Sequence, residues 1–151
     1  MLSSAPFECP SGLLAHAQQH LPLKTAVVNP ETETVMTSAK LATEHNLIEP
    51  ILVGDAGAIN SIATAINWDI GKFTVVDAGS EIEAAKLSVG LARSGEVFAL
   101  MKGHIHSETL MQEALQRKQG IRLKRRPSHA FYMTVPGNEQ GICITDAVIN
   151  V

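Results

Sequence analysis

One short segment of the sequence, residues 101–107, concentrates side chains that could take part in chemistry. It joins the cation of Lys102 to a glycine, Gly103, and then to His106 and Ser107. A helix is predicted to begin at the serine, and the free N–H groups and dipole at a helix start favour an anion. The glycine allows close approach of a ligand. The segment therefore predicts an anion-binding turn; the alternative is an ordinary loop with an N-cap serine and a solvated lysine.

The same segment also raises the question of a metal. His104 and His106 lie two positions apart, which could suggest a pair of ligands. No third ligand follows at a suggestive spacing, so we predict no metal site. The turns at Gly54 and Gly103 lack the spacing of a P-loop or a nucleophile elbow, and neither motif is expected.

A second concentration of polar residues is a basic stretch over residues 117–126. It holds six of the twelve Lys and Arg residues, with no acid nearby, although the formal net charge of the whole chain is −3. The stretch carries +6, which leaves −9 for the rest of the chain. It is either a solvated helix end and loop or a docking point for a compact polyanion. Nucleic acid is the less expected polyanion, because no aromatic residues are interleaved with the basic ones.

The end of the basic stretch contains the residues best suited to phosphate. Arg125 and Arg126 carry guanidinium groups, which bind phosphate bidentately, and Ser128 follows closely. The last apolar run, residues 142–150, contains a single charge, Asp146, and ends near Asn150. A carboxylate in such a run either pairs with an arginine or serves function. We favour a structural, orienting role for it. Cys143 in the same run is predicted to be a small buried apolar residue.

The elements that must position these residues alternate regularly along the chain. Short β-branched runs begin near residues 25, 51, 73 and 97, and each is followed by residues with helical spacing. Asn29 and Pro30 predict the N-cap and first position of one helix. Ser80 and Glu83 predict a capping box for another, and Ser107 predicts the N-cap of a third. This spacing is typical of βαβ crossovers and predicts a parallel sheet covered on both faces.

The rhythm changes after residue 120. Residues 130–135 and 142–148 read as strands whose connection is too short for a parallel crossover, so the pair should be antiparallel. The predicted fold class is therefore α/β: a three-layer αβα architecture with a mostly parallel sheet and an antiparallel addition. Residues 1–22 are predicted to be an irregular arm or linker, and residues 23–151 the first α/β domain.

Composition limits the class of protein. Hydrophobic residues make up 45% of the chain and charged residues 18%, a balance that argues against disorder. The longest apolar run, residues 97–101, is far shorter than the roughly 20 residues that span a bilayer. Two cysteines cannot form a disulfide framework, so a reducing cytoplasm is the expected location.

Several motifs, in order, resemble one enzyme family. They are Ala99-Leu100-Met101-Lys102-Gly103, His106-Ser107, Arg125-Arg126, Ser128-His129, Val135-Pro136-Gly137, Ile144-Thr145-Asp146-Ala147 and Ile149-Asn150. From residue 22 to the end, the sequence resembles the phosphate acetyltransferase and phosphate butyryltransferase family. It resembles most closely the butyryltransferase-like domain of bifunctional enoyl-CoA hydratase/phosphate acetyltransferase proteins.

The resemblance implies a function and a fold. It implies reversible acyl transfer between coenzyme A and phosphate, by way of an acyl phosphate, without a metal or a bound cofactor and in homo-oligomers. It also implies a first domain like that of isocitrate and isopropylmalate dehydrogenases. The residues expected to bind phosphate or coenzyme A are Lys102, Gly103, His106, Ser107, Arg125, Arg126 and Ser128.

The family's members are much longer than this chain, with a second domain. The residues usually credited with catalysis lie in that later part, so no catalytic residue is assigned here. We expect an N-terminal half that is inactive alone. The alternative is a non-catalytic phosphate- or coenzyme A-binding or interaction module derived from the family.

Overall fold

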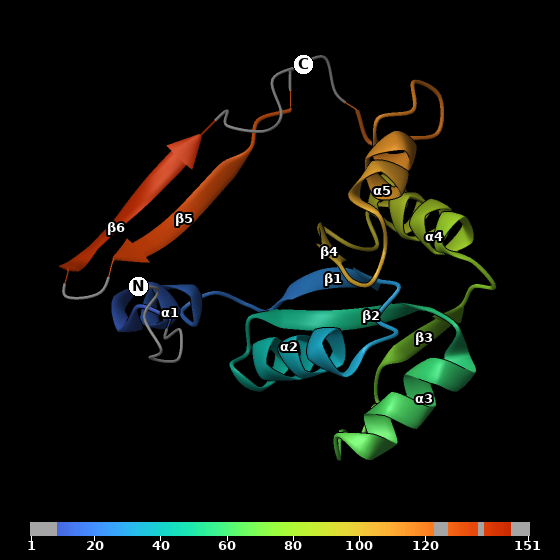
Figure 1. The fold of residues 1–151 in the computed structure, drawn as a ribbon, viewed down its shortest axis with the longest axis horizontal. Coiled ribbons are helices and arrows are strands. Elements are labelled where there is room, and N and C mark those ends of the chain that lie inside the picture. Colours follow the sequence, from blue (N-terminus) through green and yellow to red (C-terminus); the bar gives the residue numbers. More distant parts are fainter. Residues whose placement is uncertain (1–8, 123–126, 136–137, 146–151) are drawn as a thin grey trace, which may run out of the picture. The chain divides into compact units, whose positions relative to one another are not determined.

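The computed structural model describes residues 9–122, 127–135 and 138–145 (Figure 1). These residues divide into two compact units, one over residues 20–122 and one that combines the N-terminal residues up to 19 with the residues from 123 onward. Each unit is described by itself. The predicted domain boundary between residues 22 and 23 remains a prediction.

The larger unit is built on a parallel sheet, as the sequence predicted. Its strands run in the order β3-β2-β1-β4, and all neighbours are parallel (Figure 1). The strands are β1 (Leu23–Val28), β2 (Ile48–Gly54), β3 (Thr74–Asp77) and β4 (Ala99–Lys102). In the register of the central strand, Val28 lies between Val53 of β2 and Lys102 of β4. The carboxyl ends of β1, β2 and β4 are therefore level with one another.

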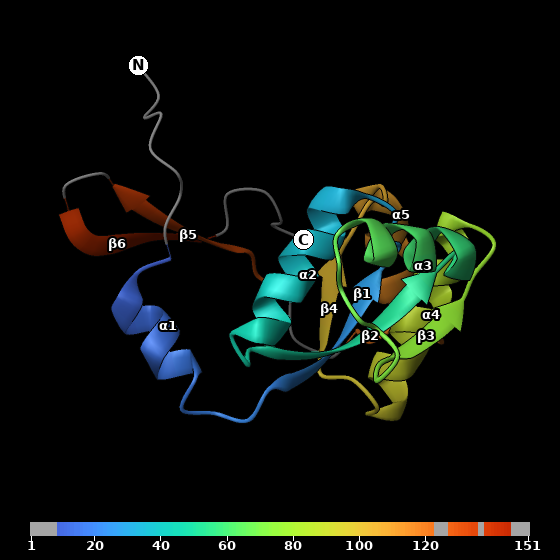
Figure 2. The same ribbon diagram turned by 90° about the horizontal axis from the view of Figure 1, so that it is seen from below.

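Helices cover both faces of this sheet and complete the three predicted layers (Figures 1 and 2). They are α2 (Glu33–Glu44), α3 (Ala56–Ala65), α4 (Glu81–Ser94) and α5 (Ser107–Ala114). Val27 points into a core with α2 and α3, whereas Ala26 and Val28 point into a second core with α4 and α5. This alternation follows from the two-residue period of a strand. Within the described residues, no helix is long and apolar enough to cross a membrane.

Two predicted helix starts are wrong. The N-cap of α2 is Thr32, whose hydroxyl accepts a hydrogen bond from the Val35 N–H at 3.4 Å, and not Asn29. The N-cap of α5 is His106, so Ser107 is the first helical residue, and no side chain caps this helix from the N-cap position. Asn29 instead has a φ of 55°, a left-handed conformation that turns the chain before the helix begins.

The predicted start of α4 is confirmed with one difference. The Ser80 hydroxyl accepts from the Glu83 N–H at 3.3 Å. The Glu83 carboxylate, however, accepts from the N–H of Gly79 at 2.9 Å rather than from that of Ser80. The helix ends at Ser94 and is followed by the C-cap Gly95, whose left-handed φ of 81° suits glycine.

The smaller unit contains the predicted antiparallel pair. Strands β5 (Ala130–Val135) and β6 (Asn138–Thr145) form a two-stranded sheet of their own. Strand β6 begins four residues earlier than predicted. Helix α1 (Ser11–Ala17) lies in the predicted irregular arm, which corrects that expectation. Cys143, predicted to be buried, is exposed, because this small sheet offers too little surface to bury both of its faces.

Candidate anion-binding site

The strand order places a switch point between β1 and β4. Strand β1 leads into α2 on one face of the sheet, and β4 leads into α5 on the other. The two connections therefore diverge at the carboxyl end of the sheet. In open α/β sheets, ligands bind at such points. The segment that the sequence singled out, residues 101–107, lies at this switch point.

Gly103 lies against the backbone at the end of β1. Its N–H donates to the Val28 carbonyl at 2.9 Å, and the next N–H, of His104, donates to the Asn29 carbonyl at 2.8 Å. A Cβ on residue 103 would overlap the Val28 oxygen and lie 2.6 Å from the Asn29 oxygen. Only glycine permits this approach, because those oxygens belong to the backbone and cannot swing away.

Asn29 also links the end of β1 to the turn after β4, the junction formed by residues 28–29 and 103–104. It is 3% exposed, and its side-chain amide donates to the His104 carbonyl at 2.7 Å. The asparagine therefore fixes both the turn after β1 and the turn after β4. Sequence analysis assigned it only to a helix cap, and its partner lies 75 positions away, beyond any local pattern.

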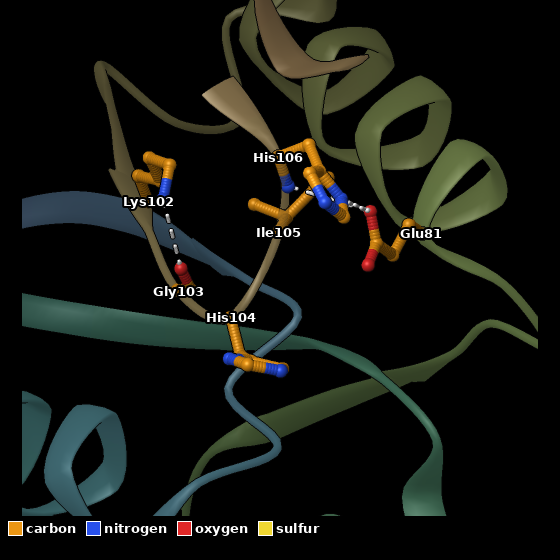
Figure 3. A pocket seen from close by; sticks show the side chains of 6 residues that line it. All are labelled: Glu81, Lys102, Gly103, His104, Ile105 and His106. Carbon is orange, nitrogen blue, oxygen red and sulfur yellow. Dashed lines mark hydrogen bonds and ion pairs between the residues drawn. The ribbon is translucent and has the colours of Figure 1, made fainter. Parts of the chain in front are cut away.

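A shallow pocket of about 150 Å³ opens beside this junction (Figure 3). It is lined by Glu81, Lys102, Gly103, His104, Ile105 and His106. Ile105 is 4% exposed and anchors the loop in the core shared with α4 and α5. The Lys102 side chain is exposed and lies over the loop, with its Nζ 3.5 Å from the Gly103 carbonyl. The pocket thus has a buried floor and basic side chains around it.

Glu81, at the start of α4, is the residue of the pocket that sequence analysis missed. Its Oε2 accepts from the backbone N–H of His106 at 3.3 Å and lies 3.0 Å from Nδ1 of the same residue (Figure 3). The hydrogen bond from the His106 side chain, then that from its backbone, lowers the pKa of Glu81. Burial partly opposes the effect, and the charges of His106 and His104 add to it. Glu81 therefore remains ionised near neutral pH.

The other predicted site residues have different positions. Ser107 is exposed and begins α5 but does not line the pocket, while Ser128 is exposed in the smaller unit. Arg125, Arg126, Asp146 and Asn150 lie outside the described residues. Lys102, Gly103 and His106 are the predicted residues that the structure brings together. Among the described residues, no group of three His, Cys, Asp or Glu side chains could hold a metal ion.

Solved structures with the same fold are phosphotransacylases. A phosphotransacetylase from Staphylococcus aureus matches 95% of this chain and 52% of its own with a TM-score of 0.66 and 18% identity. A branched-chain phosphotransacylase from Enterococcus faecalis matches 85% of this chain and 45% of its own with a TM-score of 0.62 and 20% identity. These likenesses define the fold class: α/β, of the kind found in phosphotransacylases.

The sequence is also similar to curated proteins. It is 40% identical over 139 residues to the phosphate acetyltransferase of Rickettsia felis, covering 92% of this chain and 40% of the relative. The phosphate acetyltransferase of Rhizobium meliloti is also 40% identical, with 44% of its length covered. The phosphate butyryltransferase of Clostridium beijerinckii is 33% identical over 138 residues, with 46% covered. No family model matches the chain.

The resemblance predicted from the motifs is thus confirmed. The chain is homologous to proteins named phosphate acetyltransferase and phosphate butyryltransferase. It spans between two fifths and half of the length of these curated relatives.

Proposed function

We propose that this chain is the phosphate- and coenzyme A-binding part of a phosphate acyltransferase, which moves an acetyl or butyryl group between coenzyme A and phosphate. The observation that carries the proposal is the 40% identity to phosphate acetyltransferases over 92% of the chain. The basic pocket at the switch point supports it independently, because acyl phosphate, phosphate and coenzyme A are all polyanions.

The reaction defines what the residues must do. The coenzyme A thiolate attacks the carbonyl carbon of the acyl phosphate, a C–S bond forms, the C–O bond breaks, and phosphate leaves with the electron pair. The step requires a proton acceptor for the thiol, donors for the developing oxyanion and cations for the phosphate. Lys102 and the turn at Gly103 supply the anion-binding part of this set. No metal or bound cofactor is required.

The remaining predicted residues complete the proposal. We assign Arg125, Arg126 and Ser128 to the phosphate groups of the ligands, and Asp146 and Asn150 to orientation of that segment. A cytoplasmic location and self-association, both implied by the resemblance, belong to the same proposal.

Residues 1–151 alone are proposed to bind these anions without turnover. The chain covers 40–46% of its relatives, so acyl transfer is expected to need groups from the part of those proteins that has no match here. A non-catalytic phosphate- or coenzyme A-binding module is the second candidate, favoured by the same coverage. The test is formation of acetyl or butyryl phosphate from the acyl-CoA and phosphate. Product above a no-enzyme control would overturn the binding-only proposal.

The anion site is tested by calorimetry with phosphate and with coenzyme A. Replacing Arg125 and Arg126 together with alanine is expected to weaken coenzyme A binding about tenfold or more, because the proposal gives each guanidinium group a charge-assisted contact to phosphate. Arg93→Ala is the matched control, since Arg93 is exposed in the last turn of α4, away from its pocket end. Unchanged affinity in the double variant would contradict the assignment. A salt-steep affinity for DNA would instead favour a nucleic-acid binder.

A further inference from the structure

The pocket contains an acid that an anion site should avoid. Glu81 is ionised, lines the same pocket as Lys102 and accepts the N–H at the start of α5. A carboxylate beside a phosphate repels it unless a cation lies between the two charges. Within the described residues, the side chain that forms a hydrogen bond with Glu81 is the imidazole of His106.

The contact defines the orientation of the His106 ring. An ionised carboxylate can only accept hydrogen bonds, so Nδ1 must carry the proton that it shares with Glu81. A second hydrogen bond from the His106 backbone holds the residue at two points. Within the described residues Nε2 has no hydrogen-bond partner, and the ring is 82% exposed. Nε2 is therefore free to meet a ligand.

Helix packing does not explain the Glu81–His106 pair. Helices α4 and α5 already pack through buried apolar side chains, among them Ala84, Ala85 and Leu110. An exposed ion pair adds little to such an interface. The pair is better explained by what it does to the imidazole, as carboxylates do when they orient histidines from behind.

We propose that His106 binds the phosphate group of the ligand through Nε2, and that Glu81 is the positioning residue that holds the ring and balances its charge. The proposal rests on the proposed function and extends it to a residue on another helix. When phosphate binds, the imidazole takes up one proton from the phosphate or from solvent, and the protonated ring donates Nε2–H to a phosphate oxygen while Nδ1–H remains on Glu81. The other titratable groups that line the pocket, among the described residues, are Lys102 and His104 in the same loop. Glu108 lies nearby in the chain, in the first turn of α5.

The sign of one substitution tests this proposal. If Glu81 were only a nearby acid, or a competitor for the start of α5, Glu81→Gln would tighten phosphate binding by removing a negative charge. The proposed balancing of the ring's charge by Glu81 predicts the opposite, a weakening of about three- to tenfold, because that charge balance at the His106–phosphate contact is lost. The amide oxygen of Gln can still accept from Nδ1–H, so this variant tests the charge, and Glu81→Ala tests the orientation of the ring. Glu83→Gln is the matched control, since Glu83 is an acid in the same helical turn whose carboxylate accepts from Gly79. Inorganic phosphate is the probe, titrated by calorimetry into the 151-residue chain.

Ring NMR of the ¹⁵N-histidine-labelled chain separates positioning from binding. In the free protein we expect His106 in the tautomer with hydrogen on Nδ1, and we expect Glu81→Ala to abolish this preference while Glu83→Gln retains it. On addition of phosphate, the wild-type ring should become protonated on both nitrogens. The His106→Gln variant assigns the resonances.

The possible results bear separately on the role of Glu81, on the ligand role of His106 and on the proposed function. Tighter phosphate binding by Glu81→Gln would overturn the charge-balancing role of Glu81, and an unchanged tautomer in Glu81→Ala would overturn its positioning role. Phosphate binding without any change at the His106 ring would overturn the ligand role and leave the proposed function standing. Wild-type protein that binds neither phosphate nor coenzyme A would overturn the proposed function and the ligand role with it, while the tautomer still decides whether Glu81 orients the ring.

Discussion

The carboxyl end of the sheet has an acidic half, at the start of α3, and a basic half, at the start of α5. The backbone N–H groups at these two helix starts have different partners. At α3, three carboxylates accept backbone N–H groups: Glu31 from Asp55 at 3.1 Å, Asp77 from Ala56 at 3.0 Å, and Asp55 from Ala58 at 2.7 Å. The start of this helix is thus neutralised from within. An external anion would have to displace a carboxylate there.

At α5, in the basic half, one carboxylate of the described residues accepts a backbone N–H at the start of the helix. Glu81 accepts the first N–H of this turn, and it does so together with an imidazole. Lys102 and His104 lie in the same loop. The acids at α3 therefore stabilise the fold, whereas the loop before α5 presents Lys102 and the His106 Nε2, the groups that we propose bind a ligand.

The largest expected effect lies at the junction that holds the basic half in place. Gly103→Ala should lower the free energy of unfolding by about 3 kcal/mol, because the new methyl group overlaps two backbone oxygens of β1 and the turn after it, which cannot relax. Gly90→Ala is the control: Gly90 is exposed in α4 with no atom within 4 Å of the position that a Cβ would take, and the change should stabilise by about 0.5–1 kcal/mol. Urea unfolding measures both. Wild-type stability of Gly103→Ala would refute the close approach.

A smaller effect is expected at Asn29, on the other side of the junction. Asn29→Gly keeps the left-handed backbone but removes the hydrogen bond to the His104 carbonyl, at a cost of about 1–2 kcal/mol. Asn46→Gly is the matched control, because Asn46 has a φ of 59° and is exposed. It should unfold at the same urea concentration as wild type or a higher one. Equal effects of the two variants would mean that backbone conformation alone explains Asn29.

The acidic half should respond in stability and not in binding. Asp55→Ala removes the N-cap of α3 and is expected to cost about 1 kcal/mol. Phosphate affinity, measured by calorimetry at a temperature where the variant remains folded, should equal that of wild type. A changed affinity would show that the two halves of the edge are coupled, which would break the contrast between them.

Local sequence patterns correctly predicted the structural features that depend on residues close together in the chain. The four strands, their parallel direction and the turn at Lys102 and Gly103 follow from apolar runs, crossover lengths and a compact motif. The antiparallel pair followed from the length of its connection. Each signal lies within a few residues of the element that it specifies, so one sequence was enough.

The errors in the predicted helix starts arise where the role of a residue depends on a partner far away in the sequence. Asn29 has the sequence neighbourhood of a helix cap, but its amide is used by His104, 75 positions away. Ser107 suits an N-cap, but the helix begins one residue earlier, because the Leu110 N–H donates to the His106 carbonyl. The His106 N–H in turn donates to Glu81, 25 positions before it. Neither partner can be found from spacing, because the fold alone brings these segments together. The pocket could therefore be located from the sequence, while the residues that hold it could not.

The smallest expected effect is the dependence of stability on pH at the Glu81–His106 pair. The pKa of Glu81 is lowered in the folded protein, chiefly by the hydrogen bond from His106, from an ordinary value of 4.5. A carboxyl group with a lowered pKa stabilises the folded state above its unfolded pKa, and this contribution is lost as the pH falls through the folded pKa.

The difference in urea midpoint between wild type and Glu81→Gln should therefore be constant above pH 4.5 as far as the carboxyl is concerned, and should shrink as the pH falls below it. Glu83→Gln controls for the loss of an acid from the first turn of α4. The effect should be small, because the pair is exposed, and should diminish in high salt. A difference that persists unchanged in strong acid would mean that Glu81 acts through packing rather than charge. It would then lose the electrostatic role that distinguishes the basic half from the acidic one.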